Sequence, residues 1–308
     1  MNLEDVLAQG DPSKLRELSP EDMTRLFWKM KGLRKQVERD GAFWSSTNEN
    51  LKAAYEKLDE QERELLRTYN IIREDMEVAQ QVQRALLPKM SAEMSAELEV
   101  AVYHKQLHQV GGDYYDYFRT RDDRSAIGVF DISGHGASAA LIMSFLKAQF
   151  MHAMTLVDTP KTIVERVNGA CYEFLREVRR YATVNFVVFQ PGGLRYVSGG
   201  GYGLLLRGGQ SYTFAKTDPF IGLRKRAYQE FDLPFGGDDV LALYTDGMVE
   251  AQNAAGADYS VARLNSLIKK HRDAGVDDIL RVCVDDYQAF RKEDSDDITL
   301  LVIRKRQR

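Results

Sequence analysis

The chain has 308 residues, 44% of them hydrophobic, which suits one large domain with an accessory segment or two modest domains. Its 42 basic and 46 acidic residues give a net charge of −4, so nothing in the composition points to a nucleic-acid partner. The two cysteines, Cys171 and Cys283, lie far apart in apolar runs and are expected to be buried thiols of a reducing compartment.

The N-terminus resembles neither a secretory signal nor a membrane anchor. It has no basic n-region and no apolar h-region, and no run of the chain approaches the roughly 18 apolar residues of a membrane span. We therefore expect a cytoplasmic protein without a membrane span.

Residues 1–45 are predicted to be a helical N-terminal region. Ser19 is a candidate N-cap, Pro20 takes the first helical position, and Asp22 follows three residues after the cap. No chemistry can be assigned to this region. We interpret it as a small docking or dimerisation element that leaves room for an upstream regulator.

Residues 46–90 carry a heptad pattern. Apolar or aromatic residues alternate by four and three, broken only by Glu62 and Gln83, and Pro88 ends the helix. A sustained repeat of about 3.5 residues is typical of a coiled coil, so a parallel homodimer is predicted. The alternative is a single long helix that packs on its own domain. The heptad positions are Leu51, Tyr55, Leu58, Glu62, Leu65, Tyr69, Ile72, Met76, Ala79, Gln83 and Leu86.

Residues 91–308 are predicted to form one α+β domain. Short β-type runs are separated by glycine-containing turns, and the helical runs are grouped, which favours an α+β sandwich over a parallel sheet. Helices are expected near 137–154, 159–178, 261–271 and 276–290. Strands are expected near 98–106, 114–118, 126–132, 183–190, 194–198, 202–207, 210–215, 239–244 and 298–303.

Two aspartates flank a predicted hairpin. Asp113 precedes one strand and Asp131 ends the next, so a register that pairs Phe118 with Ala126 also places Asp113 opposite Asp131. Two carboxylates that close repel each other unless a cation lies between them. Asp116 is expected on the other face of its strand, because side chains alternate, and is a weaker candidate.

A second pair of strand ends repeats this layout. Asp246 ends one predicted strand, and Asp296 and Asp297 open the last one, so antiparallel pairing would bring these acids to one edge. Clustered carboxylates without cysteine or histidine partners favour a hard cation such as Mg²⁺ or Mn²⁺. Two pairs indicate two ions, an arrangement suited to attack of water on a phosphoryl group.

Each of these residues also has a plainer interpretation. An aspartate beside glycine at a strand end is commonly a turn residue. Gly134 and Gly136 could allow the backbone to approach a ligand, or could simply form a strand-to-helix turn. His135 between them could donate a proton to a leaving group, although a structural role is favoured.

Four stretches stand out in chain order: VGGDYYDYF, GVFDISGHGASAALIM, LYTDGMVEAQN and DDITLLVI, with DPFIGL ahead of the third. In this order they resemble the bacterial branch of the PPM/PP2C Ser/Thr phosphatases, the RsbU and SpoIIE family. The resemblance covers roughly residues 76–305. It implies a PPM/PP2C-like αββα sandwich, in which two antiparallel sheets face each other between helices and metals bind at one edge.

The resemblance implies two Mn²⁺ or Mg²⁺ ions and a set of residues that hold them. Asp131 matches the acid that bridges both ions, Ile132 the residue that lends a backbone carbonyl, and Asp113 a ligand of one ion. These acids would carry catalysis through the ions. The other ion is matched by Asp246 and Asp296, with Asp297 as a supporting residue where many relatives have asparagine.

Two departures from the family stand out. The stretch SGGGYG (198–203) lies where many relatives carry an Ala-Gly-His-like motif, and no counterpart of the phosphate-binding arginine of eukaryotic relatives is found.

The resemblance implies a protein phosphatase whose substrate is a phosphorylated STAS-domain anti-sigma-factor antagonist, in a stress-response or sporulation partner switch. Residues 76–89 are similar to the helix that links an N-terminal input to the metal site in this branch. Two rival functions are a catalytically silent scaffold that signals through the coil and, from Gly111–Asp113, a nucleotide cyclase. Tyr114 counts against the cyclase, because a GGDEF-type enzyme would need a second acid there.

Overall fold

A computed structural model describes residues 18–214 and 218–306 of the chain. The chain divides into two compact units between Ile72 and Arg73. Helix α2 (Pro20–Leu86) runs through this boundary. Its predicted N-cap is confirmed, since the Ser19 hydroxyl accepts from the Asp22 backbone N–H at 3.1 Å and donates to the Asp22 carboxylate. The expectations for residues 1–17 lie outside the described residues.

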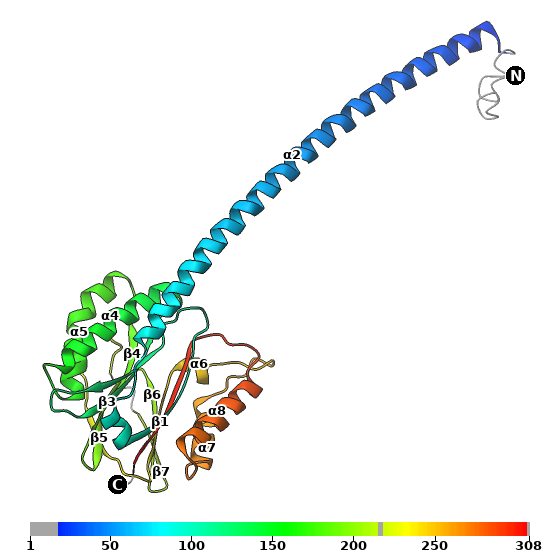
Figure 1. The fold of residues 1–308 in the computed structure, drawn as a ribbon. Coiled ribbons are helices and arrows are strands. Elements are labelled where there is room, and N and C mark those ends of the chain that lie inside the picture. The colour runs from blue at the N-terminus through cyan, green and yellow to red at the C-terminus, as the bar shows by residue number, and fades with distance from the viewer. Residues whose placement is uncertain (1–17, 215–217, 307–308) are drawn as a thin grey trace. The chain divides into compact units, whose positions relative to one another are not determined.

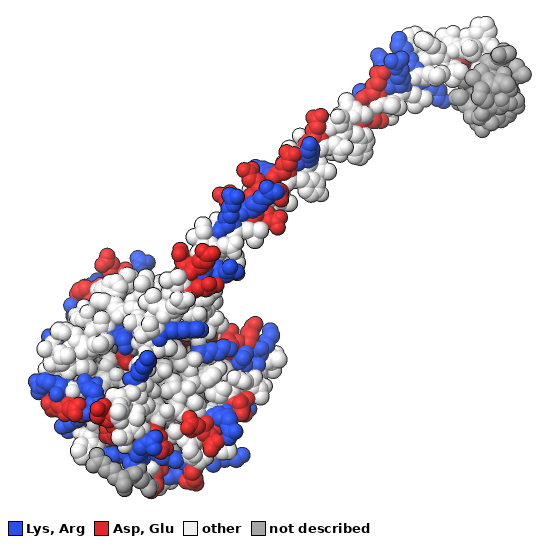
Figure 2. All heavy atoms as spheres, viewed as in Figure 1, with Lys and Arg blue, Asp and Glu red and all other residues white. Residues whose placement is uncertain are grey.

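The helical part of the first unit leaves its apolar side chains uncovered. Along α2 the heptad residues Leu51, Tyr55, Leu58, Leu65 and Tyr69 are all exposed. Figure 2 shows basic and acidic side chains interspersed with other residues along the helix, and several of them form i,i+4 ion pairs. Such pairs add only a few tenths of a kcal/mol each. The apolar seam therefore has no partner within the described chain.

The second unit contains two antiparallel five-stranded sheets (Figure 1). Most of the predicted strands and helices are confirmed, while three short elements, α3, β8 and α6, were not anticipated. The first sheet has the order β1 (Leu98–Lys105), β10 (Ile298–Lys305), β9 (Val240–Tyr244), β6 (Tyr202–Arg207) and β7 (Gln210–Thr213). The second has the order β2 (Tyr114–Arg119), β3 (Ser125–Ile132), β4 (Ala182–Gln190), β5 (Gly193–Gly199) and β8 (Phe231–Pro234). The helices are α3 (Ala92–Glu97), α4 (Ala137–Met154), α5 (Pro160–Glu177), α6 (Asp246–Val249), α7 (Val261–Lys270) and α8 (Val276–Phe290).

Three clusters of buried apolar side chains stabilise this unit. Helices α4 and α5 pack on the sheet that begins with β2, around Phe150 and Phe186. Helices α7 and α8 pack on the other sheet. A third cluster fills the space between the sheets, with Val129 and Val187 from one and Leu243 from the other. The layers are therefore helices, sheet, sheet and helices, which confirms the predicted αββα sandwich.

Both cysteines are free and buried, as expected. Among the described helices, none is long and apolar enough to cross a membrane.

Candidate metal-binding active site

The hairpin of β2 and β3 has the register predicted from the sequence. Phe118 pairs with Ala126 and Tyr114 with Phe130, so the next opposed positions are Asp113 and Asp131. Asp113 is buried, and Asp131 is partly buried. The two carboxylates that flank this hairpin therefore meet at one end of their sheet.

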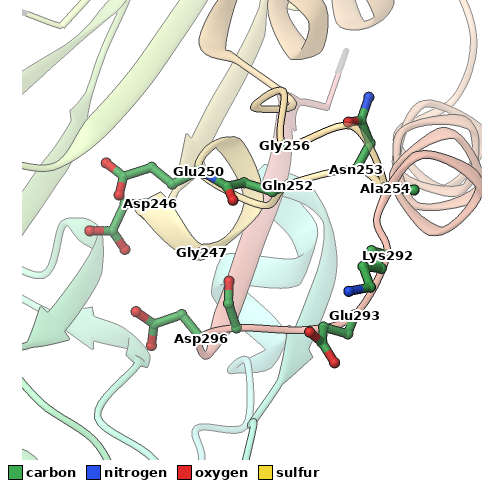
Figure 3. Close-up of a pocket in the computed structure, with 11 residues that line it drawn as sticks. Asp246, Gly247, Glu250, Gln252, Asn253, Ala254, Gly256, Lys292, Glu293 and Asp296 are labelled. Carbon is green, nitrogen blue, oxygen red and sulfur yellow. The ribbon is translucent and has the colours of Figure 1, made fainter.

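The second pair of acids also meets as predicted. Strands β9 and β10 are antiparallel, with Tyr244 opposite Leu300. Asp246 opens α6 directly after β9, and Asp296 lies just before β10. Figure 3 shows the carboxylates of Asp246, Glu250 and Asp296 pointing to the same side. These acids thus gather at the edge of the other sheet.

Asp113 joins the two sheets through hydrogen bonds. One of its carboxylate oxygens accepts hydrogen bonds from the hydroxyls of Thr245 and Thr299, each at 2.7 Å. The Thr299 hydroxyl also lies 3.0 Å from Nδ1 of the partly buried His104. Because Thr299 donates to Asp113, its oxygen is free to accept from His104, which favours the tautomer protonated at Nδ1. Sequence reasoning missed these residues, although both threonines lie close to predicted ligands.

Asp297 holds the loop that leads into β2. Its oxygens accept backbone N–H bonds from Leu107 at 2.7 Å, from Gly112 at 2.6 Å and, more weakly, from Asp113 at 3.4 Å. The side chain is almost fully buried. Asp297, predicted as a supporting ligand, therefore acts in this structure on the position of Asp113.

Three glycines allow these close approaches. A Cβ at Gly111 would lie 2.1 Å from an Asp297 oxygen, and one at Gly247 would lie 2.0 Å from the Asp297 backbone oxygen. A Cβ at Gly112 would lie 2.8 Å from the backbone oxygen of Ile132, the carbonyl predicted to face a metal. The Gly-Gly-Asp sequence is thus explained by the crowding around these oxygens.

Burial and, after it, mutual repulsion raise the pKa values of the acids at the edge. Burial, followed by the charges of Asp246 and Asp296, raises the pKa of Asp131 to about 7. Burial and the charge of Asp131 raise the pKa of Asp113 well above its ordinary value, against the two threonine hydrogen bonds. Burial also raises the pKa of Asp296, with Asp246 contributing. Asp131 thus interacts with Asp113 of its own pair and with Asp246 and Asp296 of the other sheet.

These residues fit a hard divalent cation. The available donors are carboxylate oxygens together with the Ile132 carbonyl that Gly112 leaves accessible, which are ligands preferred by Mg²⁺ and Mn²⁺. A bound cation would also relieve the repulsion that raises their pKa values. Within residues 18–214 and 218–306, no three His, Cys, Asp or Glu side chains already converge as a ready coordination shell. Binding would therefore require these carboxylates to turn toward a shared ion.

An open groove of about 570 Å³ adjoins the acids. It is lined on one side by Asp246, Glu250 and Asp296, and farther away by Asn253 and Lys292 (Figure 3). Its lining is predominantly polar, so it is suited to a charged group or an exposed peptide segment rather than to an apolar ligand.

Asp116 and His135 were weaker candidates for the site. Asp116 forms an ion pair with Lys147 and accepts from the Tyr114 hydroxyl, away from Asp131, which agrees with its lower ranking. His135 is exposed at the edge, and its ring lies 5.1 Å from that of His108, centroid to centroid. Burial raises the pKa of Asp296, and His135 opposes this rise only slightly. Its two proposed roles, structural and proton donor, stay open.

Known proteins resemble this chain in sequence. The sequence model of the family "Stage II sporulation protein E (SpoIIE)" matches residues 121–306. The chain is similar to two phosphoserine phosphatases of Bacillus subtilis. It is 24% identical to RsbP over 67% of this chain and 51% of RsbP. It is also 24% identical to RsbU, over 76% of this chain and 71% of RsbU. The chain thus spans about half the length of RsbP.

Solved structures show the same fold. The PP2C domain of SiaA from Pseudomonas aeruginosa aligns with a TM-score of 0.69 and 23% identity, over 77% of this chain and 98% of that domain. The catalytic domain of PstP, described in complex with two manganese ions, aligns with a TM-score of 0.52 and 14% identity, over 68% and 99%.

Proposed function

The chain belongs to the SpoIIE family of PP2C-type phosphatases, and from this premise we propose that it is a Mn²⁺- or Mg²⁺-dependent protein phosphatase acting on phosphoserine or phosphothreonine. The observation that carries the proposal is the gathering of Asp113, Asp131, Asp246 and Asp296 at one edge. Burial, together with the charges of Asp246 and Asp296, raises the pKa of Asp131 to about 7, which is the property expected of a site built for cations.

Each residue has a proposed part in holding the ions. Asp131, which responds to the charges of Asp246 and Asp296, is proposed to bridge two ions, and the Ile132 carbonyl to assist. Asp113 would serve one ion, with its orientation fixed by hydroxyls of the opposite sheet. When bound, the ions would supply the positive charge that activates water for attack on phosphorus.

The proposed substrate is a phosphorylated STAS-domain protein in a partner switch. Two considerations support it. The motifs resemble those of phosphatases in such switches, and the similar proteins RsbP and RsbU are named phosphoserine phosphatases. The polar groove beside Asp246 offers room for an exposed phosphorylated segment.

A second copy of the chain is proposed to cover the apolar seam of α2. The exposed residues Leu58, Leu65 and Tyr69 have the spacing of a coiled-coil seam. At the other end of the pattern, Gln83 is buried and bonds to both the backbone oxygen and the N–H of Gly111, at 2.8 and 3.2 Å. The end of α2 is thereby tied to the loop that carries Asp113, which offers a route from dimer geometry to the active site.

This route can be tested with a helix breaker. Proline at Leu65 removes a backbone hydrogen bond and distorts the helix at a cost of about 3 kcal/mol. We expect Leu65→Pro to weaken the dimer, measured by analytical ultracentrifugation, and to change the phosphatase rate. An unchanged dimer together with an unchanged rate would rule out regulation through the coil.

The activity itself is tested by phosphate release from a phosphorylated STAS-domain protein. The assay compares Mn²⁺ with chelator for the wild type, Asp131→Asn and the control Asp286→Asn, whose residue lies on α8 outside the acidic edge. We expect Mn²⁺-dependent release by the wild type and the control only. Metal binding without release from any phosphoprotein would favour the scaffold, and turnover of a nucleoside triphosphate would favour the cyclase.

A further inference from the structure

Arg180 is positioned by an unusual helix end. After the last turn of α5, the Arg179 N–H donates to the Arg176 carbonyl at 3.2 Å and the Arg180 N–H to the Leu175 carbonyl at 2.9 Å. This pair of bonds is a Schellman motif. Arg179 takes the left-handed position with φ of 54°, where glycine is usual. The motif turns the chain sharply and directs the next residues toward the acidic edge.

The segment that follows is fastened to the turn after Asp131. Ser133 and Tyr181 exchange two hydrogen bonds, each at 2.9 Å, one from the Ser133 N–H to the Tyr181 carbonyl and one from the Tyr181 N–H to the Ser133 hydroxyl. The guanidinium of Arg180 lies against Gly134. A Cβ there would be 2.5 Å from Nη1 and 2.9 Å from Cζ. The backbone carbonyl of Gly134 in turn faces Gly112, beside Asp113.

The guanidinium of Arg180 lacks a carboxylate partner in the described part of the chain. It is partly buried, and neither an ion pair nor a side-chain hydrogen bond is formed by its guanidinium among residues 18–214 and 218–306. A partly buried arginine ordinarily has an anionic or carbonyl partner, because burying its charge is costly. Its five donors are thus available to a ligand at the edge where Asp131 and Asp113 lie.

We propose that Arg180 binds the phosphoryl group of the substrate, an inference that rests on the proposed phosphatase function. A phosphorylated side chain carries a charge of about −1.5 to −2 at neutral pH. Such a group, placed among the acids of this edge, needs positive charge besides that of the ions. Arginine presents a planar fork that matches phosphate oxygens in pairs. Lys292, the basic residue that lines the groove, is exposed and offers only a point charge.

The test measures phosphate affinity directly with the full chain in Mn²⁺. The probes are p-nitrophenyl phosphate as substrate and inorganic phosphate as competitive inhibitor, with phosphate binding also followed by calorimetry. Loss of charge-assisted hydrogen bonds predicts that Arg180→Ala raises the inhibition constant of phosphate and the KM about 10- to 100-fold. Arg180→Lys should lie between this variant and the wild type, because it keeps the charge without the fork.

Two control variants separate local binding from general charge. Arg176→Ala removes an exposed arginine of the same helix end and is expected to change phosphate affinity less than twofold. Lys292→Ala removes the rival cation of the groove. Thermal unfolding of Arg180→Ala and Arg180→Lys should stay close to that of the wild type, which distinguishes lost binding from lost structure.

The outcomes separate this inference from the proposed function. An active wild type whose phosphate affinity is unchanged in Arg180→Ala, or falls only in Lys292→Ala, overturns the role of Arg180 and leaves the phosphatase standing. A wild type that neither hydrolyses the ester nor binds phosphate overturns both. Phosphate binding that depends on Arg180 without turnover supports the anion site and counts against the phosphatase.

Discussion

Replacing Asp131 with asparagine should stabilise the metal-free protein even though it removes a central residue of the proposed site. In the absence of cations, the Asp131 carboxylate is partly buried and repelled by Asp246 and Asp296, and its pKa is raised to about 7. An acid whose pKa is higher in the folded state binds more protons when folded. Stability therefore falls as pH rises from the unfolded pKa toward the folded one. Asparagine has no charge to lose and removes this dependence.

The size of the effect follows from the two pKa values. A change from 3.8 to about 7 corresponds to about 4 kcal/mol above pH 7. Part of this penalty is already present at pH 5. The part that develops between pH 5 and the folded pKa amounts to about 3 kcal/mol. Relative to the wild type, Asp131→Asn should thus gain about that much between pH 5 and pH 8.

Urea unfolding in chelator at pH 5 and pH 8 measures this difference. Asp286→Asn is a matched control of opposite sign. Hydrogen bonds from Arg263, aided by one from Tyr259, lower the pKa of Asp286, although burial acts in the opposite direction. Removing the Asp286 carboxylate should therefore destabilise the protein at pH 8. Mn²⁺ should raise the urea midpoint of the wild type and leave that of Asp131→Asn nearly unchanged. Equal or lower stability of metal-free Asp131→Asn at pH 8 would refute the claim that burial and the neighbouring acids raise the pKa of Asp131.

Three further predictions concern the supports of the edge. Asp297→Ala should destabilise even the metal-free protein by about 3–5 kcal/mol in urea unfolding, because buried backbone donors of the loop lose their acceptor; a gain in stability would instead mark a repelled ligand. Arg179→Gly should stabilise by about 1 kcal/mol, since glycine tolerates the left-handed φ, and an unchanged melting temperature would contradict this. His104→Phe should weaken Mn²⁺ binding about tenfold in calorimetry by freeing Thr299, without abolishing the fold; unchanged affinity would deny His104 a positioning role.

The sequence alone predicted those elements that depend on local spacing of residues along the chain. The register of the β2–β3 hairpin could be predicted because only a short polar turn separates the two strands. Phe118 indeed pairs with Ala126. The heptad pattern likewise predicted a helix, which the structure shows as part of α2. Gln83 broke that pattern, and the structure gives the reason, since its side chain bonds to the Gly111 backbone rather than completing an apolar seam.

What the sequence could not supply are the contacts between segments distant along the chain. Thr299 and Asp113 are 186 residues apart, and only the packing of one sheet on the other brings the hydroxyl to the carboxylate. Arg180 depends on a helix end that places a non-glycine residue at positive φ, against local preference. Local preference is most often overridden at functional sites, where the surrounding structure fixes a strained conformation. The position of Arg180 therefore follows from the folded helix end and not from the residues around it in the sequence.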